Sequence, residues 1–109
     1  MALQHSQPLE VIDMRPLGSR LRESKTCSLL KTDHLQLMRV VLLERQALPQ
    51  HHVPGKMTLL CIEGQVRVNV RAGTHELGAG ELMMLPADEP HAVVAVRDAS
   101  LLMTVLLPD

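Results

Sequence analysis

Histidine, methionine and cysteine are the residue types in this chain that could bind a transition metal. His51 and His52 stand in tandem in the segment QHHVPG, and His91 follows in EPHAV. Met57 and Cys61 lie in one apolar run, four residues apart, so on a strand both side chains would point to the same face. Imidazole suits Zn, Cu, Fe and Ni, and a usable site generally needs at least three protein ligands. By residue type, these five side chains are candidates for metal ligands.

The elements that must position these side chains are strands. The chain contains apolar runs such as CSLLKT, HLQLMRVVLLERQ, MTLLCIE, QVRVNVR, HAVVAVRD and SLLMTVLL, with turn-forming residues between them. This pattern predicts roughly eight to ten short strands, typical of an all-β sandwich or barrel, with at most one short helix near residues 19–24. Val66, Val68 and Val70 alternate with polar residues. That strand should place one face on the core and the other in water.

The chain has the length and composition of one domain. It has 109 residues, of which 46% are hydrophobic and 21% are charged, with no repeats or linkers. We predict an N-terminal arm over residues 1–14 and a barrel over residues 26–107. The segments LMMLP and AVVAV do not alternate, which predicts strands covered on both faces by the opposite sheet or by a second subunit. A homodimer is therefore expected.

Composition also excludes some classes of protein. A net charge of −1 and the absence of Phe, Tyr and Trp argue against binding of nucleic acid. No apolar run approaches the length of a membrane span, and the first residues lack the basic start and apolar stretch of a signal peptide. We expect no membrane association and a cytoplasmic location. The sequence contains no G-x-S-x-G motif, which argues against a serine nucleophile of that type.

Two spaced motifs carry a family resemblance. Gly80 is followed by five residues, then Pro86, and His91 comes five residues later. Six residues separate Met57 from Gly64. Together with the segment LPQHHVPG, this spacing resembles the two motifs of the cupin family over residues 48–95. The resemblance implies a jelly-roll β-barrel of two antiparallel sheets, but it leaves the function open because cupins include enzymes, storage proteins and sensors.

The resemblance also implies an incomplete set of metal ligands. Metal-binding cupins use three His and one Glu, and Met57 stands at the position of that Glu. A three-residue spacer puts His51 and Val53 at the two remaining His positions, whereas a four-residue spacer puts Gln50 and His52 there. We favour the first register. The sequence leaves open whether His51 or His52 faces the barrel.

Three additions would complete the site around His51 and His91. His52 would serve if a kink turned it inward, and Met57 with Cys61 would give a soft set suited to copper or zinc. A water or a substrate is the third option. Both Met57 and Cys61 are, however, more often core residues than ligands.

Three hypotheses for function follow. The first is a module that binds a small molecule or one divalent transition metal (Zn, Cu, Fe, Ni or Mn) at the barrel centre, in an apolar cavity, without catalysis. The second is a metal-dependent cupin enzyme, such as a dioxygenase or isomerase. The third is a structural or partner-binding β-domain that holds no metal. The sequence does not decide whether the protein is an enzyme.

The charged residues and glycines near the motifs are also given expected positions. Glu63, at a strand end, is expected to face water, and Arg39 and Arg67 to lie on the outer face of a sheet. Gly64 and Gly80 are expected in tight turns that bring the two motif strands together.

Overall fold

The structure is a computed structural model that describes residues 5–51 and 53–108. Within these residues the chain forms one 3-10 helix, η1 (Gly18–Glu23), and seven strands. The strands are β1 (Cys27–Lys31), β2 (Leu35–Leu42), β3 (Ala47–His51), β4 (Met57–Val70), β5 (Gly73–Gly78), β6 (Leu82–Leu85) and β7 (His91–Leu106). The expected short helix is present, and the all-β class is confirmed.

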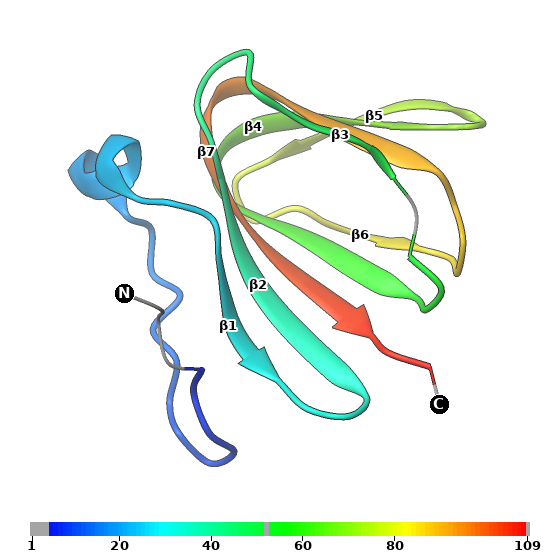
Figure 1. The fold of residues 1–109 in the computed structure, drawn as a ribbon. Helices are drawn as coiled ribbons and strands as arrows, with labels where there is room; N and C mark the ends of the chain where they lie inside the picture. The colour runs from blue at the N-terminus through cyan, green and yellow to red at the C-terminus, as the bar shows by residue number, and fades with distance from the viewer. Residues whose placement is uncertain (1–4, 52, 109) are drawn as a thin grey trace.

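Two long strands organise the molecule. Strands β4 and β7 pair antiparallel twice, residues 57–61 with 101–105 and residues 66–69 with 92–95. Around the first stretch the strand order is β1-β2-β7-β4-β6, and around the second it is β3-β7-β4-β5. Because β4 and β7 bend between the two stretches, these two sheets face each other, as Figure 1 shows. The predicted jelly-roll barrel of two antiparallel sheets is confirmed.

The prediction of separate strands on either side of Gly64 was wrong, and so was the tight turn expected there. Gly64 lies inside β4, at a register shift between residues 61 and 66 that bends the strand. Its φ is 81°, and a Cβ there would lie 2.1 Å from the carbonyl oxygen of Asp98. Glycine is therefore required by both the backbone conformation and the close approach of β7. Gly80 does lie in a turn, between β5 and β6, with a φ of 85°.

The core lies between the two sheets. Its buried side chains come mainly from the long strands, and they include Met57, Leu59, Cys61, Val66, Val68, Val93, Ala95, Leu101, Met103 and Val105. Before the bend of β4 the odd-numbered residues point inward, and after it the even-numbered residues do. Val66 and Val68 are buried and Arg67 and Asn69 are exposed, so the predicted alternation is confirmed.

Residues 5–14, the described part of the predicted N-terminal arm, lie beside β1, and residues 15–17 lead from them into η1 (Figure 1). The backbone N–H groups of Leu17 and Gly18 donate to the two carboxylate oxygens of Glu63, at 2.8 and 3.0 Å, and the Ser100 hydroxyl donates to the same carboxylate. Glu63 was expected to face water, and that prediction was wrong. Its carboxylate fastens the start of η1 to the barrel.

The arm has further attachments. Ser6 N–H donates to the Leu29 carbonyl at 2.8 Å, and the Arg39 guanidinium donates to the Asp13 carbonyl at 2.8 Å. Arg39 thus lies on the outer side of β2, as expected, since its neighbour Val40 is buried. Over the described part of the chain, no helix has the length and apolar character that crossing a membrane demands.

Candidate functional site

His91 is the best-defined residue of the candidate site. It begins β7 and is only 1% exposed, so its ring lies inside the barrel. The preceding loop is held by Asp88 N–H, which donates to the Val53 carbonyl at 2.8 Å, and by Glu89 N–H, which donates to the Pro86 carbonyl at 3.3 Å. The first bond ties the loop to the segment between β3 and β4, and the second closes a turn within the loop. The prediction that His91 points into the barrel agrees with this burial.

The hydrogen bond at Nδ1 fixes the tautomer of His91. Nδ1 lies 3.0 Å from the carbonyl oxygen of Glu89. A carbonyl oxygen only accepts, so Nδ1 carries the hydrogen, and in the neutral ring Nε2 bears the lone pair. This is the arrangement that histidine ligands of metals usually have, with the second ring nitrogen donating to a backbone carbonyl or carboxylate. Nε2 is also fully buried.

His51 is brought opposite His91. It ends β3, and its backbone pairs with His91 across the β3–β7 ladder, after a register shift between residues 48 and 51. The side chains of Gln50 and His51 lie outside the described part of the chain, and so does the whole of His52. The two motif segments therefore meet at one end of the barrel. Whether His51 or His52 provides the ligand stays a prediction.

Met57 and Val53 belong to the apolar interior. Met57 is 1% exposed and pairs with Leu85 on one side and Val105 on the other. Val53 is half-buried and packs against the core. Both positions are those expected of core side chains in a small barrel.

Cys61 is buried, and its thiol is hydrogen-bonded at the bend of β4. Its thiol donates to the backbone carbonyls of Glu63 and Gly64, at 3.4 and 3.7 Å, at the bend of β4. Burial raises the pKa of this thiol. A protonated thiol bonded to backbone carbonyls is a poor metal ligand, because metals bind the thiolate.

Among the side chains that the structure describes, no three of the types His, Cys, Asp and Glu gather closely enough to hold a metal ion. The interior near the site is also filled. Met57, Leu59, Cys61 and His91 are each at most 1% exposed, so water-sized space does not adjoin them. The central apolar cavity that we expected is not seen around these four residues.

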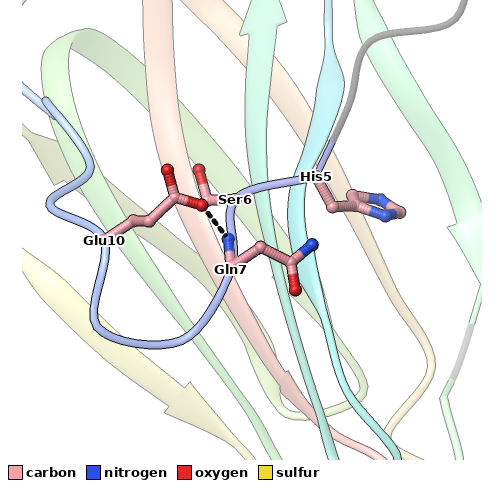
Figure 2. Close-up of a pocket in the computed structure, with 4 residues that line it drawn as sticks. All are labelled: His5, Ser6, Gln7 and Glu10. Atoms are coloured by element: carbon pink, nitrogen blue, oxygen red, sulfur yellow. Dashed lines mark hydrogen bonds between the residues drawn. The ribbon is translucent and has the colours of Figure 1, made fainter.

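A pocket of about 440 Å³ lies outside the barrel, on the N-terminal arm. Figure 2 shows its lining residues His5, Ser6, Gln7 and Glu10, with the Glu10 carboxylate accepting from Gln7 N–H at 2.6 Å. His5 Nε2 is 2.8 Å from the Ser28 hydroxyl. The His5 ring and the Glu10 carboxylate are thus engaged in holding the arm, so the barrel remains the better candidate site.

Sequence reasoning missed the Glu89 carbonyl at the site and, outside the site, the role of the Glu63 carboxylate. The Glu89 carbonyl orients His91, yet any residue at position 89 would supply a carbonyl, so no sequence signal marks it. The Glu63 carboxylate, whose neighbour Gly64 bends β4, was assigned to solvent. Arg67, as expected, lies on the outside, where its Nε donates to Glu76 at 2.9 Å.

The fold and the buried histidine together define a small jelly-roll barrel with a histidine at one end of its interior. Comparison with known protein families then identifies the family to which this barrel belongs. The model of the cupin domain matches residues 38–107, and the chain belongs to this family. The motif resemblance in the sequence is thereby confirmed.

Solved structures agree on the fold. A cupin superfamily protein from Desulfitobacterium hafniense superposes with a TM-score of 0.76 at 16% identity, covering 90% of this chain and 95% of that one. An RmlC-like cupin from a Desulfovibrio desulfuricans subspecies gives 0.74 at 18% identity, with 89% and 97% covered. A conserved Streptococcus pyogenes protein of unknown function gives 0.75 at 20% identity, with 100% and 96% covered. No curated protein matches the sequence.

Proposed function

We propose that the protein binds one divalent transition metal ion inside the barrel, through Nε2 of His91 and an imidazole of the tandem pair His51 and His52. The observation that carries this proposal is the orientation of His91. Its ring is buried, and its Nδ1 donates to the Glu89 carbonyl, which leaves Nε2 as the nitrogen with the lone pair. The β3–β7 register supports the second ligand, since the backbone of His51 lies opposite His91.

The ligand chemistry points to a nitrogen-binding metal. Two imidazoles suit Zn, Cu, Fe or Ni, and a water or a small ligand would fill the remaining positions once the packed side chains around His91 move apart. Such an ion, when bound, would supply a Lewis acid or a redox centre. The free thiols of Cys27 and Cys61 are in keeping with a reducing compartment, and a cytoplasmic location is part of the proposal.

The packing of the interior favours an ion over an organic molecule. Met57, Leu59 and His91 have almost no accessible surface, so an organic ligand would have to displace side chains that are already packed. A metal ion is smaller, and binding it requires only that the coordinating nitrogen atoms of the histidines approach one another. We therefore place a small organic molecule second, as a group that completes the coordination of the metal.

The test is metal content and metal affinity, measured without any assay of activity. Tag-free protein prepared without chelators is analysed by elemental mass spectrometry and titrated with each metal by calorimetry. Near-stoichiometric metal is expected in the parent protein. His91→Ala should weaken binding by roughly a hundredfold or more, since it removes a ligand outright and even partners of ligands are worth 10–100-fold.

Three further variants sharpen this test. His51→Ala and His52→Ala identify the second ligand, because only the residue facing the barrel should matter. His75→Ala is the matched control, since His75 is exposed on β5. Equal metal binding by the parent and by His91→Ala would contradict the proposal, as would a parent that binds none of the four metals.

A further inference from the structure

A second pocket, of about 400 Å³, lies outside the barrel and away from the histidines. Its lining comes from the segment that leads into η1, from η1 itself and from the outer side of β2, and consists of Asp13, Arg15, Pro16, Leu17, Arg20 and Arg39. Figure 1 shows η1 and the segment before it beside the sheet that contains β1 and β2. The volume is within the range of sites for small molecules. We call this space the arginine pocket.

The one carboxylate in the lining of the arginine pocket is paired with one of its arginines. Nε and Nη2 of Arg15 donate to the two carboxylate oxygens of Asp13, at 3.0 and 2.7 Å, and Arg15 N–H donates to Oδ1 at 3.0 Å. The side-chain hydrogen bonds from Arg15, together with its backbone N–H, hold the pKa of Asp13 well below its ordinary value. The carboxylate therefore stays charged, and Asp13 and Arg15 neutralise each other.

The other two guanidinium groups retain unused donors. Nη2 of Arg39 donates to the Asp13 carbonyl at 2.8 Å and lies 3.5 Å from Met14 Sδ. Within the described part of the chain, Nε and Nη1 of Arg39 have no acceptor, and neither has any side-chain nitrogen of Arg20. Arg39 is half-buried and Arg20 is exposed, and both line the pocket. Two forks of N–H donors thus face the same space.

The arginine pocket carries a positive charge. Three guanidinium groups and one carboxylate line it, which gives a net charge of +2. The Glu63 carboxylate also interacts with the charge of Arg39, and counting it leaves +1. Its oxygens, however, already accept from Leu17 N–H, Gly18 N–H and the Ser100 hydroxyl. An anion between Arg20 and Arg39 would offset the repulsion between two like charges.

We propose that the arginine pocket binds the phosphate group of a small phosphorylated molecule, through the guanidinium groups of Arg20 and Arg39. Phosphate oxygens point in several directions, so one phosphate accepts from two forks that come from different elements. A carboxylate has only two oxygens, and that of Asp13 is taken up by the single fork of Arg15. A phosphate monoester carries a charge of about −1.5 to −2 at pH 7, which offsets the charge of the pocket.

The remaining lining suits the organic part of such a molecule. Pro16 and Leu17 supply apolar surface beside the guanidinium groups. Because Arg20 belongs to η1 and Arg39 to β2, the bound phosphate also links η1 to the sheet. The site is separate from the metal site, since Arg39 lies on the outer side of β2 and His91 is inside the barrel.

The test is calorimetric titration of the full chain with inorganic phosphate, glycerol phosphate and succinate. The buffer contains no phosphate and the ionic strength is held constant. Metal is first removed with a chelator, which is then dialysed away, so that no anion can bind to a metal ion in the barrel. We expect a Kd of roughly 1 mM for both phosphates, as two or three exposed charge-assisted hydrogen bonds would give. Succinate, a dicarboxylate, should bind at least tenfold more weakly.

Arg20→Gln is the decisive variant. The Arg20 side chain makes no bond within the described residues, so its loss should leave the fold intact by far-UV circular dichroism. It should weaken binding of glycerol phosphate by roughly tenfold or more. Arg20→Lys keeps the charge without the fork and should fall between the two. Arg39→Gln should weaken binding as much, and circular dichroism checks its fold because it also loses the bond to Asp13.

Arg71→Gln is the matched control. Arg71 is exposed in the turn between β4 and β5, far from η1 (Figure 1), and its loss should leave the Kd unchanged. A parent that binds neither phosphate overturns the proposal, and so does a folded Arg20→Gln that binds as tightly as Arg71→Gln. Equal binding of succinate overturns the assignment to phosphate. Binding of inorganic phosphate without glycerol phosphate overturns the assignment to a phosphorylated molecule.

Discussion

Replacing Glu63 by Gln removes the charge that fastens η1 to the barrel. The carboxylate accepts hydrogen bonds from Leu17 N–H, Gly18 N–H and the Ser100 hydroxyl. Gln keeps one acceptor oxygen and turns an amide NH₂ toward one of these donors, which is then left without its bond. Hydrogen bonds to charged groups contribute about 1.5–3 kcal/mol each. We expect Glu63→Gln to lower the free energy of unfolding by about 2–3 kcal/mol at neutral pH.

The effect should depend on pH in a definite direction. Burial of Glu63 alone would raise its pKa, but the hydrogen bonds from Ser100, Leu17 and Gly18 and the charge of Arg39 outweigh it, and the pKa lies below the ordinary 4.5. The unfolded chain therefore binds the proton more readily than the folded one. The stabilisation by the carboxylate is complete above pH 4.5 and is lost as the pH falls through the lower, folded-state pKa.

The assay is thermal unfolding followed by far-UV circular dichroism. A loss of about 2–3 kcal/mol should lower the melting temperature by roughly 10 °C at pH 7. The difference between the two proteins should shrink as the pH falls below 4.5 and through the lower, folded-state pKa of Glu63. Trypsin should also cut the variant faster after Arg20 or Arg22, because η1 is no longer held. Glu76→Gln is the matched control, since Glu76 is exposed and bonded to Arg67. Equal melting temperatures at pH 7, or a gap that persists unchanged at low pH, would refute this role of the carboxylate.

Other predictions concern the bend of β4 and the two sulfur side chains near the site. Gly64→Ala should lower the free energy of unfolding, measured in urea, by several kcal/mol, because the added Cβ would lie 2.1 Å from a backbone oxygen. Gly78→Ala is the control. Its Cβ would meet only a flexible side chain at 3.4 Å, so the free energy of unfolding should change by less than about 1 kcal/mol. A thiol reagent at mildly alkaline pH should label Cys27 in the folded protein but reach Cys61 only on unfolding, since burial raises the pKa of the Cys61 thiol; equal labelling rates would contradict this. Met57→Leu should change stability by less than about 1.5 kcal/mol and leave metal affinity unchanged, and a loss of affinity in calorimetry would show that the thioether is a ligand.

Local patterns in the sequence predicted the elements well. The alternation of Val66, Val68 and Val70 describes a half-exposed strand because side-chain direction depends only on the pleat. The short helix is also local. Strand boundaries were predicted less well, since a glycine with positive φ serves equally in a turn and in a bend within a strand, and Gly64 does the second. Only the approach of Asp98 from β7 distinguishes the two cases.

The candidate site divides in the same way. Motif spacing predicted that His91 would lie inside the barrel, and it is buried there. Glu63 was predicted to face water because its partners are the backbone N–H groups of Leu17 and Gly18, which are far away in sequence. Every residue except proline has a backbone N–H, so the residue types at positions 17 and 18 do not reveal this contact. Strand periodicity placed Cys61 on the same face as Met57, and both are buried; the carbonyls that its thiol contacts depend on the register shift beside it, which strand periodicity does not contain.

The position of β7 has a consequence for how the chain reaches its fold. This strand follows all the others along the sequence, yet β2, β3 and β4 each pair with it. As the polypeptide leaves the ribosome, those three strands have no central partner, and their apolar sides remain unsatisfied until residues 91–106 emerge. Assembly is thus a late and concerted event, slow in the manner of folds dominated by distant pairings. A chain stalled before residue 91 would be a substrate for chaperones rather than a half-built barrel.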